Sequence, residues 1–266
     1  MSDRLELPSG GTPFGASPSF VELLRRERPE AVPPLTNADT AALSVPHGTT
    51  VLGLKYADGM LMAGDRRATA GNLIADAKMK KVFAADDYSA IAIAGAAGQA
   101  IEMVKLFQLE LEHYEKITGD RLSLEGKANR LAQLIRQNFP LAMQGLVVVP
   151  LFGGFDTRRS EGRIFYYDAT GGRWEEDDFQ TTGSGSLPAK NSLKKRWRPG
   201  LTRDEAVRVA VEALIDAADD DAATGGPDPA RGIYPVVLAV TAEGAEEVAE
   251  ADVAAGVAAV VEGRSR

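Results

Sequence analysis

The sequence predicts an α+β fold in which β-sheets pack together and helices cover them on the outside. Strand-like runs come first along the chain, followed by two helical segments, more strands, further helices and a strand. Because each sheet and each helix buries one face, strand groups separated by helix pairs favour packed sheets with helix layers outside. The 266 residues are 44% apolar, which is enough for one large core.

The first elements predict a β-hairpin. Residues 49–57 (TTVLGLKYA) and 60–65 (MLMAGD) are rich in strand-forming residues and flank the pair Asp58-Gly59. An Asp-Gly pair between two such runs is a strong hairpin signal. Two further strands are expected over 81–85 and 88–95, separated by a tight turn.

Helical spacing of apolar residues predicts helices over 97–118 and 124–144, although Gly126 and Pro140 weaken the second one locally. The later elements follow in order. Strands are expected over 146–155, 163–168, 174–182 and 233–240, with helices that begin near Ser186 and at Thr202. The form Thr202-Arg203-Asp204-Glu205 is that of a capping box. The Ala- and Glu-rich tail after Glu243 is helical at best.

A different composition marks residues 1–48, which we call the leader. Seven of the fourteen prolines lie there, and only Ser19–Arg28 could form a short amphipathic helix. Proline fixes φ and removes a hydrogen-bond donor, so the leader is expected to be extended. Residues 49–266 are then one globular domain.

Composition excludes several kinds of chemistry. The chain has no cysteine and only two histidines, His47 and His113. Disulfides, thiol nucleophiles and cysteine or multi-histidine metal sites are therefore not expected, and no cofactor is expected. The net charge of −8 argues against a nucleic-acid-binding protein, which normally carries a basic face.

No membrane segment or secretory signal is expected. The longest apolar stretch, residues 141–155, is interrupted by Gln144, Pro150 and three glycines, and it is too short to span a bilayer. The first residues carry acids and lack an apolar core. We therefore expect the protein in the cytoplasm.

The junction His47-Gly48-Thr49-Thr50 is the sharpest candidate for chemistry. A linker glycine followed by a β-branched strand residue is the plain structural reading of Gly48-Thr49. A threonine hydroxyl, however, needs a base before it can act as a nucleophile, and an N-terminal threonine carries its own base, an α-amine with a pKa of about 7.7–8.0. That amine exists only if the Gly48–Thr49 bond is cut.

Two other features favour this chemistry. Asp65 and Lys81 each lie at a strand end, where a partly buried lysine held by a carboxylate could stabilise an alkoxide; the alternative is a surface ion pair. The segments Gly183–Ser186 and Asp221–Gly226 could bring hydroxyls and amides to the same centre, or they could be ordinary turns and helix caps. Neither segment has the lysine or glycine spacing of a phosphate-binding loop.

These motifs together resemble one family. The segment TTVLGLKYADGMLMAGDRRATAGNLIADAKMKKVF is similar to the start of a mature 20S proteasome β subunit of the actinobacterial type. The resemblance continues through IAGAAGQA, ELEHYEKITGD, GSGS and DAADDDAATGGPD, and it covers residues 47–243. It implies the four-layer αββα sandwich of the N-terminal-nucleophile hydrolases and a leader that the chain itself removes between Gly48 and Thr49.

The resemblance also implies roles for individual residues. Thr49 would be the nucleophile of a threonine endopeptidase, with Asp65 and Lys81 as the charged pair beside it. The expected orienting residues are Ser184, Asp221 and Thr224, the last of which replaces a serine found in many family members. The Gly95 N–H would stabilise an oxyanion. A first specificity pocket for apolar residues would be formed by Ala68, Thr69, Ile93 and Ala97.

The partners are implied in the same way. The family assembles α subunits and β subunits into four stacked seven-membered rings. An ATPase ring would deliver unfolded polypeptides, marked by a ubiquitin-like protein, through the α rings. Two alternatives are a simpler bacterial ATP-dependent threonine protease and a non-catalytic ring scaffold. The first normally lacks a long leader, and the second would have lost Gly48, Thr49 or Lys81.

Overall fold

The computed structural model describes residues 48–264. The predicted helix Ser19–Arg28 and the rest of the leader up to residue 47 lie outside the described residues.

Ten strands form two antiparallel sheets of five. The first sheet has the order β10-β1-β2-β11-β12. Its strands are β1 (Thr50–Tyr56), β2 (Gly59–Gly64), β10 (Phe179–Gly183), β11 (Val236–Thr241) and β12 (Gly244–Glu247). The second sheet has the order β5-β6-β7-β8-β9. Its strands are β5 (Val82–Asp86), β6 (Ser89–Ala92), β7 (Leu151–Asp156), β8 (Glu161–Tyr167) and β9 (Arg173–Glu176).

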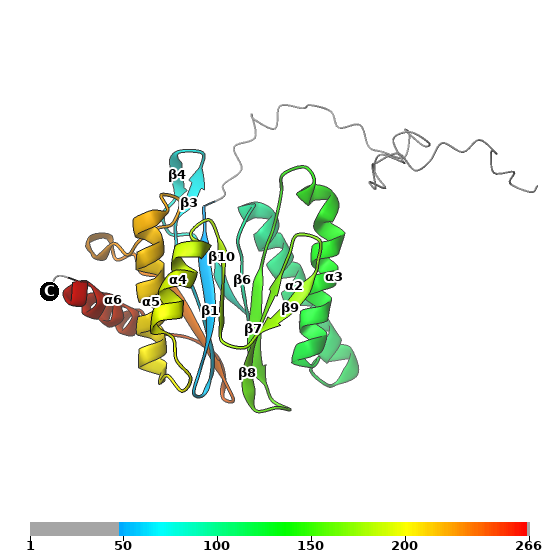
Figure 1. The fold of residues 1–266 in the computed structure, drawn as a ribbon. Coiled ribbons are helices and arrows are strands. Elements are labelled where there is room, and N and C mark those ends of the chain that lie inside the picture. Colours follow the sequence, from blue (N-terminus) through cyan, green and yellow to red (C-terminus); the bar gives the residue numbers. More distant parts are fainter. Residues whose placement is uncertain (1–47, 265–266) are drawn as a thin grey trace, which may run out of the picture. The chain divides into compact units, whose positions relative to one another are not determined.

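Helices cover the outer face of each sheet, as Figure 1 shows. The helices α2 (Ala97–Thr118) and α3 (Leu124–Ala142) pack on the second sheet. The helices α4 (Ser186–Arg196) and α5 (Arg203–Asp220) pack on the first sheet, and α6 (Glu250–Arg264) packs on α5. A third apolar cluster, which includes Val51, Met62, Val82 and Leu151, fills the space between the sheets. The predicted four-layer αββα sandwich is confirmed.

Local sequence signals explain several boundaries. The predicted hairpin is confirmed, but its turn lies one residue before the expected Asp58-Gly59 pair. Tyr56 lies opposite Gly59, so the turn residues are Ala57 and Asp58. The helix α3 keeps Gly126 and Pro140, because Ser123 caps its start and Pro140 lies in its last turn. The capping box of Thr202 and Glu205 is formed at the start of α5.

Some predicted boundaries are wrong. The strand expected over 146–155 begins only at Leu151, after Pro150, which has no N–H for a sheet ladder. The strand expected over 174–182 is two strands, β9 and β10. The strand expected to be last begins after Pro235 and is followed by β12 and α6. The short hairpin of β3 (Ala68–Ala70) and β4 (Leu73–Asp76) was not predicted.

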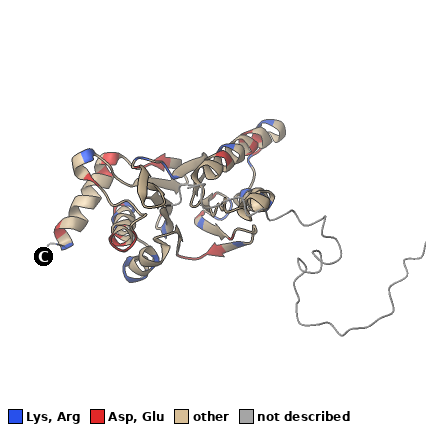
Figure 2. Cartoon of the chain, turned by 90° about the horizontal axis from the view of Figure 1, so that it is seen from above, with Lys and Arg blue, Asp and Glu red and all other residues tan. Residues whose placement is uncertain are grey.

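Charged residues of both signs lie interspersed along the helices, as Figure 2 shows. No helix within residues 48–264 is long and apolar enough to cross a membrane.

The aromatic cluster beneath α2 predicts a large stability effect. Phe152 on β7 is fully buried. Its ring contacts Phe107 edge-on at 5.6 Å and stacks on Phe165 at 6.1 Å. We expect Phe152→Ala to lower the free energy of unfolding by about 3–5 kcal/mol, because it leaves a cavity in the core.

Urea denaturation of the isolated chain measures this change. Phe139→Ala is the matched control, because Phe139 on α3 is 39% exposed and should lose far less. Equal losses in the two variants would contradict the assigned core.

Candidate active site

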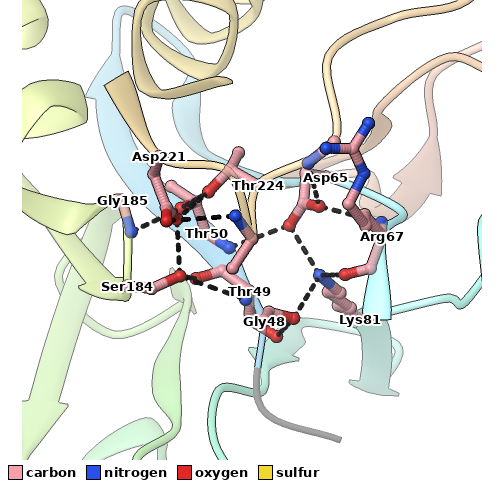
Figure 3. A network of polar contacts seen from close by, with 12 residues as sticks. Gly48, Thr49, Thr50, Asp65, Arg67, Lys81, Ser184, Gly185, Asp221 and Thr224 are labelled. Carbon is pink, nitrogen blue, oxygen red and sulfur yellow. Dashed lines mark hydrogen bonds and ion pairs between the residues drawn. The ribbon is translucent and has the colours of Figure 1, made fainter. Parts of the chain in front are cut away.

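The predicted residues Thr49, Asp65, Lys81 and Ser184 meet where the strand ends of the first sheet face the start of β5. Thr50 pairs with Gly183 and Val51 pairs with Gly64. The start of β1 therefore lies beside the ends of β2 and β10, which brings Thr49, Asp65 and Ser184 together. Lys81 comes from the second sheet, directly before β5. Figure 3 shows Thr49 between these groups.

Lys81 and Asp65 form a buried ion pair. The Lys81 Nζ lies 2.7 Å from Asp65 Oδ1, and neither side chain is exposed to solvent. The ammonium also donates to the Gly48 carbonyl at 3.0 Å and to the Arg67 carbonyl, so each of its three N–H groups has an acceptor. The surface ion pair considered from the sequence is excluded, and the expectation of a partly buried lysine is wrong because Lys81 is fully buried.

The Asp65 carboxylate is saturated with donors. Its Oδ1 accepts from Lys81 Nζ and from the Thr50 N–H at 2.8 Å. Its Oδ2 accepts from the Arg67 and Gly225 N–H groups, each at 2.8 Å. Charge-assisted hydrogen bonds of this kind stabilise a buried carboxylate. Asp65 therefore ties together three separate segments of the chain.

Burial lowers the pKa of Lys81, and the attraction and hydrogen bond of Asp65 offset this only in part. Burial disfavours the charged form of a lysine side chain unless hydrogen-bond acceptors surround it. The arrangement therefore places a positive donor of lowered pKa next to the bond between Gly48 and Thr49.

The surroundings of that bond are tightly packed. The Thr49 hydroxyl donates to the Gly48 carbonyl, the same oxygen that Lys81 contacts. Thr49 is only 6% exposed. A Cβ at position 48 would lie 2.6 Å from both Thr69 Oγ1 and the Ala223 carbonyl. Only glycine fits there without displacing its neighbours.

A second group of hydroxyls meets at Asp221, which follows α5. Ser184 Oγ and Thr224 Oγ1 each donate to Asp221 Oδ2 at 2.6 Å. Ser184 also lies next to Thr49, because its N–H donates to the Thr49 carbonyl at 2.8 Å and its Oγ is 3.4 Å from Thr49 N. Burial alone would raise the pKa of Asp221, but hydrogen bonds from Ser184 and Thr224 hold it below its usual range.

Gly95 lies at the junction of β6 and α2 with φ +105°, and a Cβ there would lie 2.1 Å from the Val147 carbonyl. The Ala96 N–H donates to Val147, and the Val149 N–H donates to Ala94. These two bonds frame Gly95 opposite Val148. The N–H of a residue framed in this way points away from the partner strand.

The four predicted pocket residues lie on the segments around this junction and on β3. Ala68 and Ile93 are buried, and the Ile93 N–H donates to the Lys81 carbonyl at 2.9 Å. Thr69 lies beside Gly48, and Ala97 is the half-buried first residue of α2. Their role in binding substrate stays a prediction.

Comparisons with known proteins identify the family of this chain. The family model described as proteasome subunit matches residues 45–228. The chain belongs to the proteasome subunit family. It is 54% identical to a protein named proteasome subunit beta from Acidimicrobium ferrooxidans. This similarity extends over 248 residues, which are 93% of this chain and 90% of that protein. It is 55% identical to a protein of the same name from Streptomyces griseus subsp. griseus, over 90% of this chain and 85% of the relative.

The predicted resemblance is therefore confirmed, and membership of this family implies assembly with other subunits into a proteasome core. The close contacts also include groups that the sequence did not reveal. Thr50 Oγ1 contacts Thr224 Oγ1 at 2.6 Å and accepts from the Gly185 N–H. Its place directly after Thr49 in the predicted junction was the only signal for it. The Arg67 carbonyl and the Gly225 N–H are backbone groups, which no residue type announces.

The ion pair predicts unequal effects for its two partners. In Asp65→Asn the new NH₂ faces two donors whichever oxygen it replaces, and the Lys81 ammonium loses its counter-charge. We expect a loss of about 3–5 kcal/mol in the free energy of unfolding. Lys81→Met should cost clearly less, because Asp65 keeps three backbone N–H donors. Denaturation of the full chain measures both losses.

Lys80→Met is the matched control, because Lys80 is exposed and pairs with Glu247 on the surface. It should change stability little. A larger loss for Lys81→Met than for Asp65→Asn would show that the backbone donors do not sustain the Asp65 carboxylate.

Proposed function

We propose that Thr49 is the nucleophile of this proteasome subunit and that the chain exposes it by cutting its own Gly48–Thr49 bond. The chain is then a catalytic β-type subunit, a threonine endopeptidase of the N-terminal-nucleophile class. One observation carries the proposal: the Thr49 hydroxyl and the buried Lys81 ammonium meet on the Gly48 carbonyl.

The proposed self-cleavage begins with attack of Thr49 Oγ on the Gly48 carbonyl carbon. Lys81 stabilises the negative charge that develops on the carbonyl oxygen. The C–N bond breaks, the hydroxyl proton ends on the Thr49 nitrogen, and an ester joins Gly48 to Thr49 Oγ. Water then hydrolyses the ester, which leaves a carboxylate on Gly48 and restores the Thr49 hydroxyl beside a free α-amine.

The same atoms serve the peptidase reaction. The freed amine takes the proton of the Thr49 hydroxyl, which then attacks a substrate carbonyl and forms an acyl ester. The nearby Lys81 charge lowers the pKa of the amine and keeps it neutral at working pH. Asp65 holds Lys81 in place, and Ser184, Asp221 and Thr224 orient the amine and the attacking water.

The remaining expectations concern substrate and partners. The Gly95 N–H stabilises the oxyanion of the substrate, and Ala68, Thr69, Ile93 and Ala97 line a pocket for an apolar side chain. Substrates are unfolded polypeptides, marked by a ubiquitin-like protein and delivered by an ATPase ring through α-subunit rings. The proposed compartment is the cytoplasm.

Intact mass spectrometry of assembled particles tests the nucleophile. The wild-type chain should lose residues 1–48, and Thr49→Ala should keep them and show no peptidase activity, because no hydroxyl remains to attack either carbonyl. Thr49→Ser is the matched control: it keeps the hydroxyl and should be cleaved. A processed and active Thr49→Ala particle would refute the proposal.

Assembly is expected to control both reactions. Leu106, Leu109 and Ile117 on α2 are between 47% and 71% exposed, and their spacing places them on one helical face. Exposed apolar patches of this kind mark interfaces. We expect isolated chains to be uncleaved and inactive, and α subunits to trigger ring formation and cleavage.

Size-exclusion chromatography with a fluorogenic peptide measures this dependence. Leu109→Lys should impair assembly and cleavage together, whereas Lys105→Ala, an exposed change on the same helix, should not. Hydrolysis by monomers at the rate of assembled particles would contradict the dependence on assembly.

A further inference from the structure

Thr50 has a side chain that the proposed reaction does not use. It is fully buried, although it carries a hydroxyl in the first position of β1. Its Oγ1 accepts a hydrogen bond from the Gly185 N–H at 3.0 Å and lies 2.6 Å from Thr224 Oγ1. Its backbone N–H donates to Asp65 at 2.8 Å. Thr50 is therefore bonded to both polar groups that flank Thr49 (Figure 3).

The hydrogen bonds that link Gly185, Thr50, Thr224 and Asp221 can run in only one direction. An ionised carboxylate only accepts, so the Thr224 hydroxyl gives its single proton to Asp221 Oδ2. The Thr50 hydroxyl must then donate to Thr224 Oγ1, because that proton is already engaged. The Gly185 N–H fills the acceptor position of Thr50. The donors in sequence are Gly185, Thr50 and Thr224, and Asp221 is the final acceptor.

This series of hydrogen bonds ends beside Thr49, the proposed nucleophile. Asp221 Oδ2 also accepts from Ser184 Oγ at 2.6 Å, and Ser184 Oγ lies 3.4 Å from Thr49 N. Hydrogen bonds in series polarise one another and hold a single orientation. A change at Thr50 therefore reaches the Thr49 nitrogen through Thr224, Asp221 and Ser184.

We propose that Thr50 is a positioning residue, whose hydroxyl holds Thr224 and Asp221 in the orientation that the Thr49 amine requires. The proposal rests on the proposed function of Thr49. It assigns to Thr50 no contact with substrate or with the reacting atoms.

Steady-state hydrolysis of a fluorogenic peptide by assembled particles tests this role, with rates expressed per processed chain. Thr50→Val keeps the shape and the backbone N–H but removes the hydroxyl. We expect kcat to fall about tenfold with KM unchanged, since a buried donor or acceptor loses its partner. Thr50→Ser, which restores the hydroxyl, should recover most of the rate.

A double-mutant cycle separates positioning from a general loss of stability. If Thr50 acts only through Thr224, Thr50→Val should cost nothing further in a Thr224→Val background. Thr181→Val is the matched control: Thr181 is a buried threonine on β10 whose hydroxyl bonds the Ser186 carbonyl instead. Its effect on kcat should be small and should add to that of Thr224→Val.

Three outcomes would overturn the proposal: wild-type kcat in Thr50→Val, additive losses in the cycle, or no recovery with serine. If Thr50→Val does not assemble, Thr50→Ala takes its place, because it also removes the hydroxyl, and an unchanged kcat in that variant overturns the proposal equally. The Thr49→Ala result decides the proposed function separately, since it involves neither Thr50 nor Thr224.

Discussion

A lysine ammonium without any exposure to water governs the organisation of this site. Taking a charge out of water is costly unless an opposite charge and further hydrogen bonds replace the solvent. Lys81 receives them from Asp65 and from the carbonyls of Gly48 and Arg67. Asp65 in turn needs donors, and backbone N–H groups of Thr50, Arg67 and Gly225 provide them. One buried charge thus fixes the path of four chain segments.

The packing of the two sheets makes this charge pair possible. Asp65 follows β2 of the first sheet, and Lys81 precedes β5 of the second. Val51 and Val82, neighbours of the site in sequence, both belong to the apolar cluster between the sheets. The distance between the charged partners therefore depends on a core that contains no charge, and the site is a consequence of the sandwich rather than of one loop.

The sequence predicted the charged and hydroxyl-bearing residues that meet at the site, because their residue types carry chemistry. It also predicted the layers, because strand and helix periodicities alternate in long segments. It was wrong where a proline removed a ladder donor, at Pro150 and before β11, and it omitted the three-residue strand β3. Thr50 belonged to the predicted junction but was given no role, because a threonine at a strand start is ordinary. The Arg67 carbonyl and the Gly225 amide are backbone groups, which no residue type reveals.

The two threonines of the hydrogen-bond chain suit this buried position better than serines would. A β-branched side chain has few χ1 rotamers, so each hydroxyl is placed largely by its own backbone. Thr50 and Thr224 are both fully buried, and their methyl groups lie in the protein interior, where an empty space would cost stability. Serine would keep the hydrogen bonds but regain rotamer freedom and leave a gap. The methyl groups therefore help to hold the direction of the hydrogen bonds that lead to Asp221.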